Sequence, residues 1–117
     1  MVSTVCGRLA PQKDAIDLIK AAFPAGSMTG APKIEAMKII DQIEPVKRGV
    51  YSGAIGYLDF RGALDLSIAI RTAVIKDSTC YFNVGGAVVA DSEPLAEFEE
   101  TMHKAAAMKL ALGRVRR

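Results

Sequence analysis

The feature that most constrains the fold is the stretch 79–104, in which a strand, a glycine pair and a helix follow one another. Residues 79–84 are rich in aromatic and β-branched side chains, which predicts a β-strand. Gly85 and Gly86 interrupt the apolar run, and glycine inside a strand marks a bulge or a close approach of another group to the backbone. An Asp-Ser pair of helix-capping type and then Pro94 predict the start of a helix.

This helix has two distinct faces. Its apolar stripe consists of Leu95, Phe98, Met102 and Ala105. Glu97, Glu100 and Lys104 follow another face, so that two carboxylates lie one turn apart near an open glycine backbone. Such a pair suits a hard divalent cation such as Mg²⁺. The same spacing suits a solvated face with an i,i+4 ion pair, and the pattern alone leaves both interpretations open.

Length and composition limit the class of protein. The chain of 117 residues predicts one domain, 1–117, which is globular because 50% of the residues are hydrophobic and 24% charged. The apolar runs are too short for a membrane span, and the N-terminus lacks a signal-peptide layout, so we expect no membrane association and a cytoplasmic location. A net charge of +2 gives little support for a nucleic-acid partner, and we expect none.

Cysteine and histidine content restricts the chemistry further. Cys6 and Cys80 fit two free thiols, and no spacing of cysteines suggests a zinc site. His103 is the only histidine, which excludes a site built from several histidines.

The N-terminal third predicts a short strand and two helices. Val2–Val5 is the strand candidate, a helix follows from Asp14 to about Phe23, and a second helix runs from Pro32 to Glu44. The loop between the helices, residues 24–33, contains two glycines and two hydroxyl side chains. It suits either an anion site at a helix N-terminus or an ordinary helix start.

Three strands are predicted after the short basic link at 46–49. They are 50–60, 65–76 and 79–84, separated by short turns. The resulting order β-α-α-β-β-β-α predicts an α+β fold in which an antiparallel meander is flanked by helices.

Arg71 stands out within the predicted strand 65–76. A charged residue in the middle of a sheet is rarely left without a partner, because an unpaired buried charge is costly. Asp65 or a glutamate would make a structural salt bridge with it. The alternative is a planar guanidinium that grips a ligand carboxylate with two hydrogen bonds.

Taken together, four motifs resemble the chorismate-utilising enzymes. The motifs are FPAGSMTGAPK, RGVYSGAIGYLDF, DLSIAIRT and GGAVVADSEPLAEFEE with a lysine four residues further on. The family contains anthranilate synthase component I, aminodeoxychorismate synthase component I, isochorismate synthase and salicylate synthase. The resemblance covers about residues 2–112 and matches only the C-terminal part of such an enzyme, which implies a fragment of a larger chorismate-binding α+β fold.

The resemblance assigns roles to individual residues. It implies Mg²⁺ as cofactor, with Glu100 as a ligand and Glu97 at the neighbouring acidic position. The substrate-binding residues that it implies are Tyr51, Arg71, Gly85, Gly86, Lys104 and Ser27. Ala87 departs from the glycine that many members carry, and alanine would be strained there if the backbone had positive φ.

The loop sequence GSMTGAPK and the Gly85-Gly86 pair resemble the aminodeoxychorismate synthases most, with anthranilate synthase component I as the alternative. The first implies amination of chorismate at C4 towards 4-aminobenzoate and folate, and the second implies tryptophan biosynthesis. Either would use ammonia from a glutamine amidotransferase subunit. The family's catalytic residues lie upstream, so this segment contains none of them. We expect the isolated chain to be inactive, or to act only as a binding or interaction module.

Overall fold

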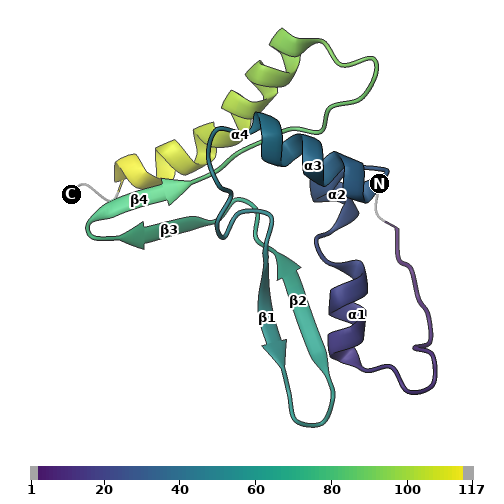
Figure 1. The fold of residues 1–117 in the computed structure, drawn as a ribbon. Coiled ribbons are helices and arrows are strands. Elements are labelled where there is room, and N and C mark those ends of the chain that lie inside the picture. Colours follow the sequence, from purple (N-terminus) through teal and green to yellow (C-terminus); the bar gives the residue numbers. More distant parts are fainter. Residues whose placement is uncertain (1–2, 115–117) are drawn as a thin grey trace.

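The computed structural model describes residues 3–114, and within them it has an α+β fold of four helices and four strands, as predicted (Figure 1). No helix in this part of the chain is long and apolar enough to cross a membrane. Cys6 and Cys80 are free thiols, as expected. The elements in chain order are α1 (Ala15–Ala22), α2 (Gly26–Thr29), α3 (Lys33–Ile43), β1 (Ala54–Leu58), β2 (Leu64–Ile68), β3 (Ala73–Lys76), β4 (Thr79–Phe82) and α4 (Pro94–Arg114).

The first predicted helix, α1, is confirmed together with its start signal. The Asp14 side chain accepts hydrogen bonds from the backbone N–H groups of Ile16 and Asp17, and the Asp17 side chain accepts one from the backbone of Asp14. This reciprocal capping box satisfies donors that a helix N-terminus otherwise leaves free. The helix ends at Ala22, and Phe23 follows in an extended conformation, because the residue before Pro24 is pushed out of the helical region.

The loop after α1 contains a helical turn, α2, that the sequence analysis did not predict. Thr29 donates its hydroxyl hydrogen to the carbonyl of Ala25 at 3.2 Å, a short-range bond that stabilises this turn. The Lys33 ammonium group donates to the carbonyl of Ala22 at 2.8 Å, so the start of α3 is tied to the end of α1. Lys33 therefore serves as a structural link in this loop, and α3 itself confirms the second predicted helix.

The strands pair as two separate antiparallel hairpins, β1–β2 and β3–β4 (Figure 1). The prediction of antiparallel strands is correct, but the single long strand 65–76 is wrong, because the chain bends between β2 and β3. The strand predicted for 50–60 is also shorter and begins at Ala54. Residues 3–5 form no strand, and Val2 lies outside the described residues.

The bend between the hairpins has a clear backbone cause. Arg71 has φ 50°, a left-handed conformation that cannot continue an extended strand. Just before it, the backbone N–H of Ser52 donates to the carbonyl of Ala69 at 3.0 Å, and the N–H of Ala69 donates to the carbonyl of Gly53 at 2.9 Å. The turn before β1 is therefore fixed against the bend after β2, and this junction positions the candidate site.

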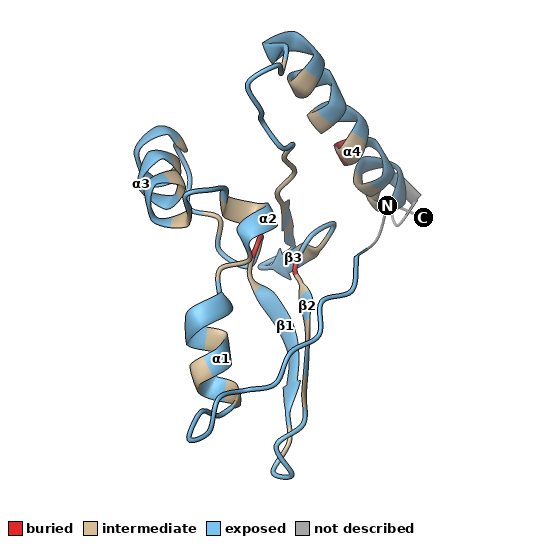
Figure 2. Ribbon diagram, turned by 90° about the vertical axis from the view of Figure 1, so that its right-hand side faces the viewer, coloured by how far each residue is buried: buried red, intermediate tan, exposed pale blue. Residues whose placement is uncertain are grey.

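Little of the chain is buried (Figure 2). Within residues 3–113 only Ser52, Ala69 and Ala105 are buried. The accessible surface is 10201 Å², whereas a compact chain of 12.5 kDa exposes about 6200 Å². The radius of gyration is 17.2 Å, against about 13 Å for a compact domain of this length. The helices and hairpins therefore enclose no core of their own, and many apolar side chains remain open to contact with further structure.

Candidate functional site

A cavity of about 310 Å³ lies where α2, the bend at Arg71, the segment after β4 and α4 come together. The side chains that line it come from parts of the chain up to 77 positions apart, between Ser27 and Lys104. All six residues that the sequence analysis assigned to substrate binding line this cavity: Ser27, Tyr51, Arg71, Gly85, Gly86 and Lys104. The fold thus brings the predicted residues into one place.

Tyr51 and the glycine pair make close contact. A Cβ atom added to Gly85 would lie 2.8 Å from the Tyr51 hydroxyl, and one added to Gly86 would lie 3.0 Å from Oε2 of Glu97. A side chain at either position would have to displace the Tyr51 hydroxyl or the Glu97 carboxylate, so glycine suits the close approach of these groups to the backbone. Ala87 also lines the cavity, and its backbone is not in the positive-φ region, so alanine is accommodated without strain.

Arg71 lies in the bend rather than in the middle of a strand, which corrects the sequence-based placement. Its side chain is exposed and lines the cavity. Among residues 3–114 no carboxylate lies within ion-pair distance of it, so the structural salt bridge to Asp65 or a glutamate, one of the two alternatives left open, is not present there. Its donors are available to a ligand.

Lys104 joins α4 to the glycine segment. Its ammonium group donates to the carbonyl of Gly85 at 3.3 Å and forms an i,i+4 ion pair with Glu100. Arg71 and Lys104 are the two charged residues among those that line the cavity, and both are cations. A half-enclosed cavity lined by cations favours an anionic ligand. Glu100 partly offsets the charge of Lys104, so Arg71 is the stronger anchor.

Glu97 and Glu100 lie on α4 beside the cavity, outside its lining. The Ser92 hydroxyl donates to Oε1 of Glu97 at 2.6 Å, and the N–H of Val89 donates to Ser92 at 3.1 Å, so the Glu97 carboxylate is held in place. Glu100 forms the ion pair that the solvated-face interpretation predicted.

The metal prediction for the two glutamates can be compared only with the chemistry of their side chains. Hard carboxylate oxygens are what Mg²⁺ prefers, and it accepts one or two carboxylates completed by water and substrate oxygens. Within the described range, no three acidic, histidine or cysteine side chains gather closely enough to hold a metal ion. Glu97 and Glu100 therefore fit Mg²⁺ as a partial ligand set, and the assignment stays a prediction.

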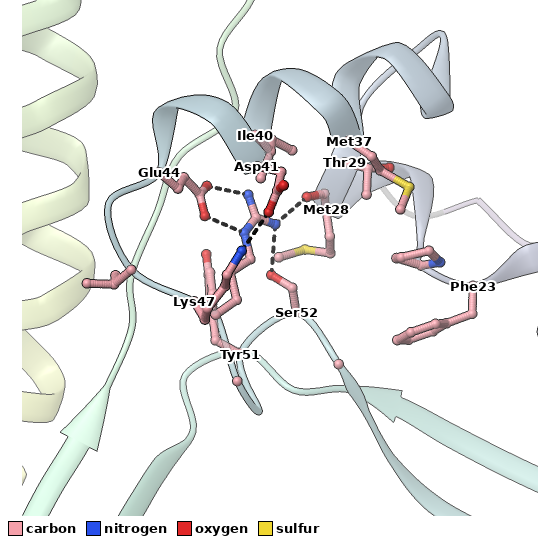
Figure 3. Close-up of a pocket in the computed structure, with 15 residues that line it drawn as sticks. Phe23, Met28, Thr29, Met37, Ile40, Asp41, Glu44, Lys47, Tyr51 and Ser52 are labelled. Carbon is pink, nitrogen blue, oxygen red and sulfur yellow. Dashed lines mark hydrogen bonds and ion pairs between the residues drawn. The ribbon is translucent and has the colours of Figure 1, made fainter.

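Sequence analysis missed Arg48, which it treated as part of a short link. Its guanidinium donates to both carboxylate oxygens of Glu44, at 2.9 and 2.6 Å, and to the carbonyl of Met28 at 2.7 Å (Figure 3). The hydrogen bonds from Arg48 hold the pKa of Glu44 below its usual value, and those bonds raise the pKa of Arg48. Arg48 lies beyond the end of α3, so the i,i+4 rule for helices gave no signal for this pair.

A second cavity, of about 390 Å³, adjoins the first through Met28 and Tyr51, which line both (Figure 3). Apolar side chains from the end of α1 and from α3 form one wall of it, with Phe23, Met37 and Ile40 prominent among them. Arg48 lies in its lining beside Tyr51, with the guanidinium carbon 5.9 Å from the centre of the ring.

The α+β fold and a cavity lined by two cations suit a protein that binds a small anion. Comparison of the sequence with known families identifies the class of protein. Residues 1–110 match the family of chorismate binding enzymes, and the chain belongs to that family.

Several proteins similar to this chain are anthranilate synthases. The chain is 55% identical to anthranilate synthase component 1 of Pseudomonas aeruginosa over 108 residues, which is 92% of this chain and 22% of that protein. It is 52% identical to that of Arthrobacter globiformis over 107 residues, 92% of this chain and 20% of that protein. The crystal structure of anthranilate synthase component I from Streptococcus pneumoniae superposes with a TM-score of 0.80 at 51% identity, covering 87% of this chain and 23% of that one.

These relatives bear on two of the expectations. The chain spans about a fifth of their length, and the expected fragment of a larger chorismate-binding fold is confirmed. The expected closest resemblance to aminodeoxychorismate synthase is not supported, because these relatives carry the alternative name. The motif GSMTGAPK and the Gly85-Gly86 pair contain too few residues to distinguish the two enzyme types.

Proposed function

We propose that this chain forms the chorismate-binding segment of an anthranilate synthase component I. The observation that carries the proposal is the convergence of Ser27, Tyr51, Arg71 and Lys104 with the glycine pair around one cavity. Relatives about 50% identical over nearly the whole chain, all named anthranilate synthase component 1, support the choice of enzyme.

The chemistry of the cavity suits chorismate, a small ligand that carries two carboxylates. The volume of the cavity, about 310 Å³, lies at the lower end of the range for small-molecule sites. The Arg71 guanidinium has no ion-pair partner among residues 3–114, and it can grip one carboxylate with two parallel hydrogen bonds. The Tyr51 hydroxyl beside Gly85 supplies a further donor at the same wall.

The second carboxylate of chorismate would lie at the side of the cavity near α4. Mg²⁺, when bound by Glu100 with Glu97 beside it, would supply positive charge for that carboxylate. Ser92 keeps the Glu97 carboxylate oriented through its 2.6 Å hydrogen bond. Lys104, tied to the carbonyl of Gly85, holds α4 against the glycine segment and orients Glu100 through their ion pair.

Proton transfer needs groups that this cavity does not contain. No carboxylate and no histidine is among the residues that line it within the described chain. We therefore assign this segment to substrate binding and orientation, with acid and base groups contributed by the remainder of the family fold. Ammonia would come from a glutamine amidotransferase subunit, the partner that the resemblance to this family implies.

A graft tests the proposal directly. The full chain replaces the matching segment of anthranilate synthase component 1 from Pseudomonas aeruginosa, to which it is 55% identical, and the resulting protein is called the graft enzyme. We expect the graft enzyme to convert chorismate to anthranilate with ammonium and Mg²⁺, as measured by product chromatography.

Three outcomes are distinguishable. Anthranilate formation with a Michaelis constant for chorismate within about tenfold of the parent supports the proposal. Formation of aminodeoxychorismate instead would reverse the choice of enzyme within the family. A graft enzyme that has the circular dichroism spectrum and elution volume of the parent but leaves chorismate unchanged would contradict the proposed function.

A further inference from the structure

Arg48 is the most extensively connected side chain near the site. Besides its two bonds to Glu44, it donates to the carbonyl of Met28 at 2.7 Å and to the hydroxyl of Ser52 at 3.2 Å. Its side chain is only 25% exposed, unlike the surface ion pair of Arg61, whose side chain is 91% exposed. The guanidinium therefore joins the end of α3, the α2 turn and the turn before β1 at a partly buried point.

These three segments carry residues of the candidate site. The α2 turn carries Ser27 and Met28, which line the cavity, and the turn before β1 carries Tyr51, whose ring lies 5.9 Å from the Arg48 guanidinium carbon. Ser52 is buried, and its backbone N–H donates to the carbonyl of Ala69, two residues before Arg71. A continuous set of hydrogen bonds thus runs from α3 through Arg48 to the bend.

We propose that Arg48 is a positioning residue of the site: it holds Tyr51 directly, and the bend with Arg71 through Ser52, in the arrangement that takes the anionic ligand. The proposal rests on the proposed function for the nature of that ligand. Arg48 lines the neighbouring cavity of about 390 Å³ and a hollow of about 300 Å³ that shares Ser27, Tyr51, Gly85 and Gly86 with the candidate site. It does not line the cavity of about 310 Å³ that contains Arg71 and Lys104, and its side-chain nitrogens donate to Glu44, Met28 and Ser52. We therefore assign it an indirect action on a ligand of that cavity.

A simple helix-end ion pair would not explain the geometry. An ion pair between Arg48 and Glu44 needs only the two bonds to that carboxylate. Arg48 uses its third nitrogen for Met28, 20 positions away in the chain, and for Ser52. Lysine cannot reproduce this fork, because its three donors radiate from one nitrogen atom.

The test uses Arg48→Lys in the graft enzyme, with Arg61→Lys as the matched surface control. We expect kcat/KM for chorismate to fall roughly 10- to 100-fold, mainly through KM, because groups that orient a site act at this scale. Ser52→Ala removes one acceptor of Arg48 and leaves its pair with Glu44, and it should cause a smaller change in the same direction. This second variant keeps the test informative if Arg48→Lys fails to fold.

A second measurement does not depend on chorismate. Tyrosines are labelled with 3-fluorotyrosine, and the ¹⁹F signal of Tyr51 is assigned with Tyr51→Phe. Arg48→Lys should shift the Tyr51 signal and leave those of Tyr57 and Tyr81 in place, since the guanidinium of Arg48 lies over the Tyr51 ring. If the graft enzyme without further substitutions does not convert chorismate, the proposed function is refuted. The ¹⁹F signal still tests the contact between Arg48 and the Tyr51 ring in that case. An unshifted Tyr51 signal, or a KM equal to that of the Arg61→Lys control, would overturn the proposal.

Discussion

Removal of the Arg71 side chain is the sharpest test of the candidate site. Arg71 has no ion pair among residues 3–114, so Arg71→Ala leaves no protein carboxylate there without its partner. The measured loss of binding free energy should therefore report only the missing interaction between Arg71 and the ligand. The Arg71 side chain is exposed at the wall of a half-open cavity. An ion pair between its guanidinium and a ligand carboxylate would therefore have surroundings intermediate between bulk water and a buried site.

The magnitude follows from that position. Two unit charges 4 Å apart attract by about 1 kcal/mol in water and about 4 kcal/mol near a protein surface. An intermediate loss of about 2–3 kcal/mol raises the Michaelis constant for chorismate roughly 30- to 150-fold. Arg71→Lys keeps the charge but loses the planar fork, so we expect a loss of about 1.5 kcal/mol, or roughly tenfold. Steady-state kinetics of the graft enzyme give both values.

The left-handed backbone at this position requires its own control. Arg71 has φ 50°, and Arg71→Asn removes the charge with a residue type that tolerates this conformation. Asparagine and alanine should raise the Michaelis constant alike if the charge matters. Arg61→Ala, at a side chain 91% exposed in the β1–β2 turn, should leave it unchanged. A Michaelis constant equal to wild type in all three Arg71 variants would refute the assignment of Arg71 to the ligand.

Further predictions concern the metal, the glycine segment and the isolated chain. Glu100→Gln in the graft enzyme should raise the Mg²⁺ concentration needed for half-maximal turnover, whereas Glu35→Gln on the exposed face of α3 should not; identical Mg²⁺ titrations would contradict the metal assignment. Gly85→Ala should lower kcat/KM roughly tenfold, because its Cβ would meet the Tyr51 hydroxyl at 2.8 Å, while Gly7→Ala, with open space around it, should match wild type. The isolated chain with Mg²⁺ and ammonium should convert no chorismate, since no carboxylate or histidine lines its cavity in residues 3–114; measurable product would show this to be wrong.

Much of the secondary structure could be predicted because its signals are local. The capping pattern of Asp14 and Asp17 fixed the start of α1, and Pro24 fixed its end. The apolar stripe of α3 and the proline after it gave its length to within one residue at each end. These signals act over one or two turns of backbone and do not depend on the rest of the fold.

The break in the strand 65–76 could not be predicted, because nothing local marks it. Arginine is not a residue that favours positive φ, and no glycine or proline lies between β2 and β3. The bend is instead fixed from a distance, by the backbone hydrogen bonds that join Ser52 and Gly53 to Ala69. Arg48 was missed for the same reason, since its bonds to Met28 and Ser52 exist only in the folded arrangement.

The distribution of burial indicates how this segment works. Two of the three residues buried within the range 3–113, Ser52 and Ala69, lie at the junction that carries Tyr51 on one side and Arg71 on the other, although most of the surrounding surface is open. Backbone hydrogen bonds and the Arg48 guanidinium fix this junction from within the chain itself. A ligand-binding group that is already oriented loses less conformational entropy on binding. Under the proposed function, the part of the site that contains Tyr51 and Arg71 would thus be held by contacts within this chain, and the remainder of the family fold would supply the opposite wall and the catalytic groups.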